Sequence, residues 1–316
     1  MKFVAQAPGK IIITGEHFVV HGAYALAAAI DRFVKVEAKV SDTTHILSKN
    51  LGLSATLPNK VPNALKPIAH VLNATLRYLN EKRGLSLIID SDIPVGSGLG
   101  SSASVAVATA TAVSEALGHH LTPKEIVDLA MVSEKMIHKN PSGIDVNIAV
   151  YGGVILFQRN SDVKSIDLNS NIDFVIGYSG LRRRTSRLIQ KVAEMKAAKP
   201  HLFNSLVQSS SRLSLLAANF MKQNDLLTLG SILNFHHIVL SWLGISIDEI
   251  DKMVEASLAA GALGAKVTGG GGGGCMIALP PINHSQQILD SLKNLGKVAF
   301  ISKIPVGGVK VWSEKD

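Results

Sequence analysis

The feature that most restricts the fold of this 316-residue chain is a glycine-rich turn that leads into a segment of small residues. The turn reads Pro94-Val95-Gly96-Ser97-Gly98-Leu99-Gly100-Ser101-Ser102-Ala103 and follows a short apolar strand expected at Leu85–Asp90. Glycine at alternate positions permits positive φ angles and lets the backbone approach a ligand without interference from a Cβ atom. The alanine-rich residues that follow predict a closely packed, buried helix from about Ser101 to Leu117.

A helix that begins directly after such a turn suits an anion, because its first N–H groups are free and its dipole is positive there. The turn is not a Walker A loop, since Ser101 rather than lysine follows Gly100, and Gly98, Gly100 and Ala103 meet the dinucleotide fingerprint only loosely. We predict a polyphosphate site; the alternative is a structural turn that caps the helix. The predicted nucleotide-binding residues are Ser91, Pro94, Val95, Gly96, Ser97, Gly98, Leu99, Gly100, Ser101, Ser102, Ala103 and Ser104.

A second glycine run, Gly269–Gly274, follows Lys266-Val267-Thr268. It lies between two apolar, strand-like segments, and ordering six glycines costs conformational entropy. The run therefore indicates a ligand or another backbone that approaches closely. A flexible linker or a plain turn is the alternative.

Strand and helix signals alternate along the chain without strict βαβ units, which indicates an α+β architecture. Capping boxes at Thr122–Glu125 and Ser246–Glu249 predict two helix starts, and a turn is expected at Pro141–Ile144.

Long helical segments become frequent after residues 160–171, and this change predicts two domains, 1–165 and 166–316. Turn residues, including Pro8-Gly9, divide the first forty residues into expected strands at Phe3–Ala7, Ile11–Thr14, Ala23–Ile30 and Val34–Val40.

The composition of the chain argues against several classes of protein. With 47% hydrophobic and 18% charged residues the chain is globular, and its net charge of +8 is dispersed except at Arg182–Arg184. Aromatic residues make up only 5%, so we expect no nucleic-acid partner. The single cysteine, Cys275, excludes an intrachain disulfide framework. We see no signal peptide and no run of about 18 apolar residues, and we expect a cytoplasmic protein without a membrane partner.

Four segments, in this order, resemble the GHMP small-molecule kinases. They are Ala7-Pro8-Gly9-Lys10 continuing to Gly22, the turn Pro94–Ala103, His138-Lys139-Asn140-Pro141-Ser142-Gly143-Ile144-Asp145, and Val267-Thr268 with the glycine run. Within the family, Gly15-Glu16-His17 followed by Val19-Val20-His21-Gly22 is similar to the branch that phosphorylates mevalonate. The branch that acts on 5-phosphomevalonate shares the opening of the first segment and stays an alternative, because a second substrate phosphate would suit Arg182–Arg184.

The resemblance implies the family's two-domain fold, with an N-terminal domain like ribosomal protein S5 and a ferredoxin-like C-terminal domain. It also implies transfer of the ATP γ-phosphoryl group to the 5-hydroxyl of mevalonate, between the two domains. Asp145 matches the family's catalytic aspartate, and Lys10 would hold it ionised and offset charge on the phosphoryl group. Ser102 and Glu134 match the ligands of Mg²⁺.

The substrate residues that the resemblance implies are Lys10, Glu16, His17, Asp145, Arg184, Thr185, Gly270 and Gly271. Glu16 and His17 would contact the hydroxyl and carboxylate ends of mevalonate. Members of the family often form dimers, so a homodimer is expected. A nucleotide-binding regulator without activity is the alternative from a different class; the side chains at Lys10, Ser102 and Asp145 argue against it.

Overall fold

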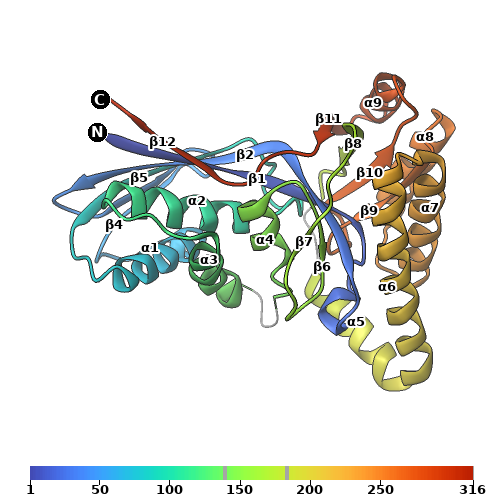
Figure 1. Cartoon of the computed structure of the whole chain (residues 1–316), viewed down its shortest axis with the longest axis horizontal. Helices are drawn as coiled ribbons and strands as arrows, with labels where there is room; N and C mark the ends of the chain where they lie inside the picture. Colours follow the sequence, from blue (N-terminus) through green and yellow to red (C-terminus); the bar gives the residue numbers. More distant parts are fainter. Residues whose placement is uncertain (138–140, 182–184, 316) are drawn as a thin grey trace.

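The computed structural model describes residues 1–137, 141–181 and 185–315, and these form two β-sheets with helices packed against each (Figure 1). The larger sheet has eight strands in the order β12-β1-β2-β5-β3-β4, with β6 paired to β2 and β7 paired to β6. Its pairs are antiparallel except β3 with β5. The strands are β1 Lys2–Thr14, β2 Ala25–Ser41, β3 His45–Ser48, β4 Leu53–Thr56, β5 Gly84–Ser91, β6 Val154–Phe157, β7 Lys164–Ser165 and β12 Lys310–Glu314.

Strand β1 passes through Pro8-Gly9 without a turn, so the predicted break there is wrong. The pairing with β2 shifts register between Pro8 and Gly9, which absorbs the irregularity as a bulge. A Cβ atom at Gly9 would lie 2.9 Å from Ile93 Cδ1 and 3.0 Å from the Leu99 carbonyl oxygen. Glycine is therefore required because the glycine-rich turn packs directly on β1. The expected break between Ile30 and Val34 is also absent, since β2 is one strand.

The helices of the first half are α1 Lys66–Tyr78, α2 Ser101–Ala116, α3 Pro123–Ile137 and α4 Ile144–Tyr151, with 3-10 turns at Val19–His21 and Asn63–Leu65. They lie on one face of the large sheet (Figure 1). As predicted, α2 is the buried helix, since Ala106, Ala108 and Ala110 are at most 2% exposed. The first capping box is also confirmed, because Thr122 N donates to Glu125 Oε2 over 2.7 Å and Glu125 N to Thr122 Oγ1 over 3.3 Å.

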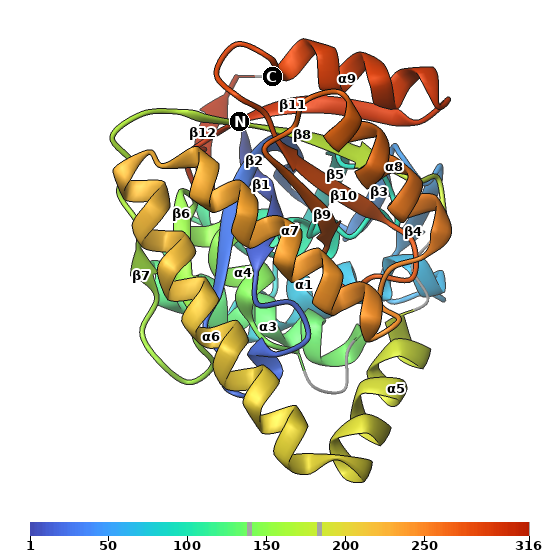
Figure 2. The ribbon, with the colours of Figure 1, turned by 90° about the vertical axis from the view of Figure 1, so that its right-hand side faces the viewer.

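The smaller sheet has the order β11-β8-β10-β9, with every pair antiparallel. Along the chain its strands and helices follow the β-α-β-β-α-β pattern of ferredoxin-like domains. This arrangement agrees with the α+β, two-domain fold that the resemblance implied. The elements are β8 Ile172–Tyr178, α5 Thr185–Ala198, α6 Pro200–Gln223, α7 Leu226–Trp242, α8 Asp248–Ala259, β9 Gly264–Thr268, β10 Cys275–Leu279, α9 Ser285–Asn294 and β11 Val298–Ile304 (Figure 2).

The start of α8 corrects the second capping box. Its N-cap is Ile247, which has an extended backbone and no capping side chain. The Ser246 hydroxyl instead donates to Asp251 Oδ1 over 2.5 Å. Ser246 therefore lies one residue too early to cap the helix.

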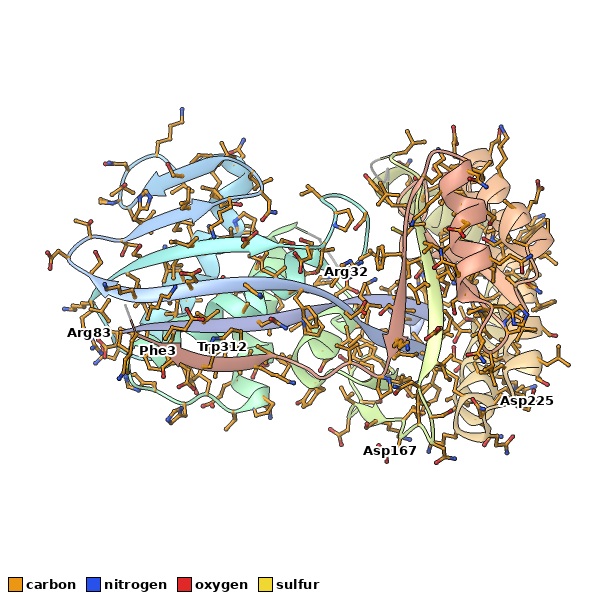
Figure 3. All side chains as sticks on the ribbon, turned by 90° about the horizontal axis from the view of Figure 1, so that it is seen from above. Phe3, Arg32, Arg83, Asp167, Asp225 and Trp312 are labelled. Atoms are coloured by element: carbon orange, nitrogen blue, oxygen red, sulfur yellow. The ribbon has the colours of Figure 1, made fainter. Side chains whose placement is uncertain are left out.

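The two halves are joined by more than the segment between β7 and β8. Strand β12 returns from the small sheet to pair with β1, which brings the two termini together (Figure 1). The Arg32 guanidinium lies 4.3 Å from the centre of the Phe300 ring, and Asp31 N donates to Ser302 Oγ over 3.1 Å (Figure 3). Among the described residues, no helix is long and apolar enough to cross a membrane.

Candidate active site

The glycine-rich turn takes the conformation that its sequence predicts. Gly96, Gly98 and Gly100 have φ angles of 76°, 88° and 83°. Helix α2 begins at Ser101 and its N-cap, Gly100, carries no side chain that caps the first N–H groups. Ser102 in the first turn is exposed. The arrangement leaves a positive helix end available to an anion.

Several predicted nucleotide-binding residues hold the turn in place. Lys10 N donates to the Leu99 carbonyl over 2.8 Å, and the Ser104 hydroxyl donates to the Pro8 carbonyl over 2.7 Å. The side chains of Ser97, Leu99, Ala103 and Ser104 are buried, whereas Val95 is exposed. A residue whose side chain is buried can contact a ligand only through its backbone atoms. The side chains of these residues therefore hold the turn against β1.

The hydroxyl of Ser91, the predicted nucleotide residue before the turn, accepts from Ile93 N over 3.1 Å. This contact lies at the end of β5. It shapes the entry of the chain into the glycine-rich turn.

Lys10 and Asp145 form an ion pair beside this turn. Lys10 Nζ lies 3.2 Å from Asp145 Oδ1, and the two side chains are 3% and 30% exposed. A Cβ atom at Gly100 would lie 2.9 Å from Lys10 Cγ, so the glycine makes room for the lysine. The pair joins β1 to α4 and leaves part of the carboxylate open to a ligand.

The segment that carries Asp145 differs from the expected one. Helix α4 starts at Ile144 after Gly143, whose φ is 90°, so Asp145 lies in the first turn of a helix that the sequence analysis did not predict. The positive end of α4 interacts favourably with an acidic side chain at this position.

The two predicted magnesium ligands lie on neighbouring helices. Ser102 is in the first turn of α2, and Glu134 lies near the end of α3, which packs against α2. The Glu134 residue is 5% exposed. Among the described residues, no group of three or more His, Cys, Asp or Glu gathers around a common point. Two oxygen ligands fit Mg²⁺ when nucleotide phosphates and water supply the rest.

Glu16 is buried within the protein rather than open to a cleft, since the residue is 1% exposed. The Glu16 and Lys266 side chains are both 0% exposed and form an ion pair through Glu16 Oε1. Glu16 Oε2 lies 3.6 Å from His236 Nε2. Burial raises the pKa of Glu16 and lowers that of Lys266, and in each case the charge of the other residue opposes the shift.

Lys266 and His236 were given no role by the sequence analysis. Burial lowers the pKa of His236 well below its usual 6.5, so the imidazole is neutral near pH 7. The available signal for Lys266 was its position in a strand, β9, whose five residues are all buried. A lysine there requires a partner, but the sequence does not say which acid supplies it.

His17 faces the second glycine run. Its Nε2 atom lies 3.1 Å from the Gly270 carbonyl oxygen, and its φ is 61°, which is uncommon outside glycine. The run joins β9 to β10 as a hairpin, since Thr268 pairs with Cys275. A Cβ atom at Gly271 would lie 2.3 Å from the Ile245 carbonyl oxygen. The run is thus a packed loop inside the domain and not a linker.

A cavity of about 650 Å³ adjoins this hairpin between α5 and the loop after α7. Lys191, Glu194, Gly244 and Gly272 are among the residues that line it. Arg182–Arg184, including the predicted substrate residue Arg184, lie outside the described residues. Thr185 begins α5, and its side chain is likewise outside them.

Known proteins are similar to the chain over both halves. The family profiles "GHMP kinases N terminal domain" and "GHMP kinases C terminal" match residues 64–153 and 216–298. A mevalonate kinase of Thermococcus sibiricus is 35% identical in an alignment 331 residues long, which covers 98% of each chain. The structure of the Methanococcus jannaschii mevalonate kinase covers 95% of this chain and 98% of its own, at 29% identity and a TM-score of 0.85. That of the L. major mevalonate kinase in complex with R-mevalonate covers 96% of each, at 27% identity and a TM-score of 0.82.

These matches confirm the resemblance that four short segments indicated. A relative above 30% identity aligns over nearly the whole length, and family profiles match in both halves. The chain therefore belongs to the GHMP kinase family, in its mevalonate kinase branch.

Proposed function

We propose that this chain transfers the γ-phosphoryl group of ATP to the 5-hydroxyl of mevalonate, giving 5-phosphomevalonate and ADP. The observation that carries the proposal is the Lys10–Asp145 pair beside the glycine-rich turn, with 3.2 Å between Lys10 Nζ and Asp145 Oδ1. The full-length relatives named mevalonate kinases, and the L. major structure with R-mevalonate, support the choice of substrate.

In the proposed reaction the 5-hydroxyl oxygen attacks the γ-phosphorus, and the bond from that phosphorus to the β,γ-bridging oxygen breaks. Asp145 orients the hydroxyl and accepts its proton. The Lys10 ammonium offsets negative charge on the phosphoryl group as it moves. Phosphoryl transfer depends mainly on such positioning and charge stabilisation.

The free N–H groups at the start of α2 would hold the phosphates of ATP. Ser102 and Glu134 would hold Mg²⁺, which supplies charge neutralisation at the phosphate oxygens when bound. On the substrate side, His17, Gly270, Gly271, Arg184 and Thr185 stay predictions. A cytoplasmic location, expected from the sequence, and a homodimer, expected from the family resemblance, likewise stay predictions.

The test is release of ADP from Mg–ATP with four acceptors: mevalonate, 5-phosphomevalonate, galactose and homoserine. We expect turnover with mevalonate and at most one hundredth of that kcat/KM with the others. Preference for 5-phosphomevalonate would replace the proposed substrate. Binding of ATP without turnover on any acceptor would reject phosphorylation of mevalonate and favour a regulator.

A further inference from the structure

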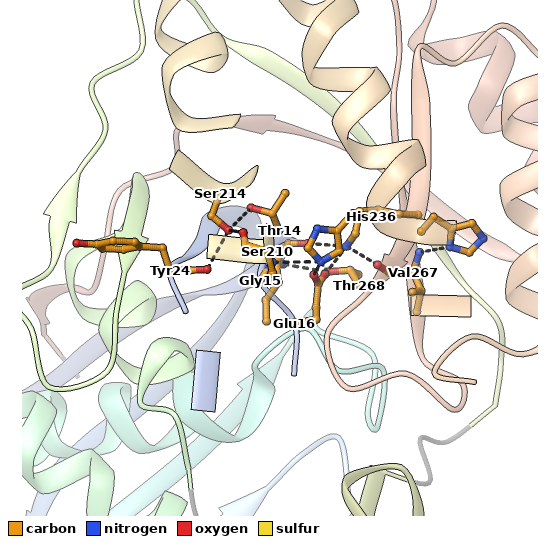
Figure 4. A network of polar contacts seen from close by, with 12 residues as sticks. Thr14, Gly15, Glu16, Tyr24, Ser210, Ser214, His236, Val267 and Thr268 are labelled. Carbon is orange, nitrogen blue, oxygen red and sulfur yellow. Dashed lines mark hydrogen bonds and ion pairs between the residues drawn. The ribbon is translucent and has the colours of Figure 1, made fainter. Parts of the chain in front are cut away.

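The Glu16–Lys266 ion pair joins the two halves of the molecule, and Figure 4 shows Glu16 beside His236 and Thr268 of the second half. Glu16 follows β1, the strand that carries Lys10, and Lys266 belongs to β9, the strand that leads into the glycine hairpin. One residue beyond Glu16, the ring of His17 contacts the Gly270 carbonyl of that hairpin. The pair therefore fastens the turn after β1 to the hairpin on the opposite side of the site.

A second contact shows that this junction is built on both strands. The Thr268 hydroxyl, at the end of β9, donates to the Ile12 carbonyl and accepts from Ile12 N, each over 2.9 Å. Lys266 Nζ also lies 3.5 Å from the same Ile12 carbonyl oxygen. The end of β1 is thus held by two side chains of β9, one neutral and one charged.

At the junction, negatively and positively charged side chains alternate from the reaction centre toward the protein interior. Asp145 pairs with Lys10, and Glu16 pairs with Lys266. The Lys10 charge also acts on both members of the second pair, favouring ionised Glu16 and opposing a charged Lys266. His236 adds a neutral ring, whose Nε2 atom lies 3.5 Å from Gly15 N. Loss of one charge leaves its partner buried and uncompensated.

We propose that Glu16, Lys266 and His236 form a buried positioning centre, and that Glu16 acts through the Gly15–His17 turn without touching the substrate. The inference rests on the proposed function, and it revises the expectation that Glu16 contacts mevalonate. Its basis is the 0% exposure of both the Glu16 and Lys266 side chains and the contacts that occupy them. The centre keeps Lys10 and the glycine hairpin at a fixed separation across the site.

The kinetic test compares Glu16→Gln, Lys266→Met and the double variant with the unchanged protein. We expect each single variant to lower kcat about 100-fold, since misplacing reacting groups by about 1 Å has that effect. The double variant removes the uncompensated charge, so its kcat should recover to about one tenth of the original. The KM for mevalonate should stay within threefold, because a positioning residue makes no contact with it.

A tenfold rise in the KM for mevalonate with an unchanged kcat in the double variant would show that the pair serves substrate binding and not positioning, and would overturn the proposal. An unchanged kcat in the double variant would overturn it as well. If the single variants do not fold, the double variant alone decides the matter. The matched control removes an ion pair that joins β1 to β2, Lys2→Met with Glu37→Gln, whose charged atoms lie 2.9 Å apart and whose side chains are 28% and 29% exposed. We expect that control to change neither kcat nor KM.

Hydrogen exchange separates this proposal from the proposed function. The amides of Phe18 and Val19 donate to the carbonyls of Glu16 and Gly15, over 2.7 and 3.1 Å. In the double variant we expect these amides to exchange at least tenfold faster, whatever the substrate proves to be. Unchanged exchange would overturn the positioning role. Absence of turnover on mevalonate by the unchanged protein would reject only the proposed substrate.

Discussion

At the scale of single residues, the site depends on small side chains that make room for large ones. Gly100 is the sharpest case, because its missing Cβ atom is the space that Lys10 fills. Its φ of +83° would also strain any other residue. The steric effect of a Cβ atom on Lys10 therefore has to be separated from the backbone strain at position 100. The chain offers Gly118 for this purpose, with a φ of +84° and no atom within 4 Å of a Cβ atom.

We predict that Gly100→Ala lowers kcat about 100-fold, because Lys10 is displaced from Asp145. Gly118→Ala should leave kcat unchanged and cost about 1 kcal/mol of stability from strain alone. Both are measured by ADP release and by thermal unfolding. Equal kcat values for the two variants would show that the space at Gly100 does not control Lys10.

His236 predicts a dependence of stability on pH. Burial lowers its folded pKa below 6.5, so under mildly acidic conditions the unfolded chain binds a proton that the folded protein does not. The free energy of unfolding should therefore fall as the pH drops below about 6.5, by up to about 1.4 kcal/mol per pH unit. The raised pKa of Glu16 acts in the opposite direction, which is why the comparison has to be made between variants.

The measurement is urea unfolding between pH 5 and 8 for the unchanged protein and for His236→Gln. We expect a flatter profile below pH 6.5 in the variant. Parallel profiles for the two proteins would contradict a neutral, buried His236.

At the scale of elements, β1 is the strand on which the site is assembled, and β9 is held to it by the Thr268 hydroxyl. Thr268→Val keeps the shape but leaves Ile12 N and O buried without this partner. We predict a loss of about 1–3 kcal/mol of stability, measured by denaturant unfolding. Thr111→Val is the matched control, since that buried hydroxyl donates only within its own helix, to Val107 O. If the two losses are equal, the contact between the strands contributes nothing specific.

Local signals predicted most elements, because capping boxes, strand patterning and the glycine-rich turn act over a few residues. Strand β10 and the start of α2 fall where the sequence places them. Helix α4 was missed because Pro141 and Gly143 precede it, and the short β3–β4 hairpin went unnoticed for lack of a strong pattern. The hydroxyl contact of Ser246 shows how a one-residue shift defeats a capping motif.

The residues of the site likewise fall into two groups, those that local sequence predicts and those that only the fold brings together. The four segments predicted where Lys10, Asp145 and the glycine-rich turn belong. The junction of Glu16 with Lys266 joins residues 250 positions apart, and only the fold brings them together. No local pattern identifies such a pair, because a lysine in a buried strand requires a partner but does not indicate which acid supplies it.

At the scale of the whole molecule, the two halves share one core. A single buried cluster contains Ile13 and Leu26 of the large sheet together with Phe174 and Met221 of the second half. Strand β12 adds a connection by returning to β1. A core that crosses the boundary between domains favours unfolding as one unit.

The two tryptophans report on this directly, because Trp242 lies on α7 and Trp312 on β12. Trp312→Phe keeps only Trp242, and Trp242→Phe keeps only Trp312. For each variant we predict that the denaturant midpoint from tryptophan fluorescence equals the midpoint from circular dichroism. Separate midpoints for the two probes would show that the halves unfold independently.

The central claim is that Asp145, paired with Lys10, directs phosphoryl transfer to the 5-hydroxyl of mevalonate. The most direct measurement is ³¹P NMR of the products from Mg–ATP and mevalonate, for the unchanged protein and for Asp145→Asn. We predict one new phosphomonoester signal, assigned to the 5-position by its coupling to the adjacent methylene, together with ADP. In Asp145→Asn the rate of its formation should fall at least 1,000-fold while ATP still binds, within the range known for general bases. A phosphorylated product at another hydroxyl, or full activity in Asp145→Asn, would contradict the account.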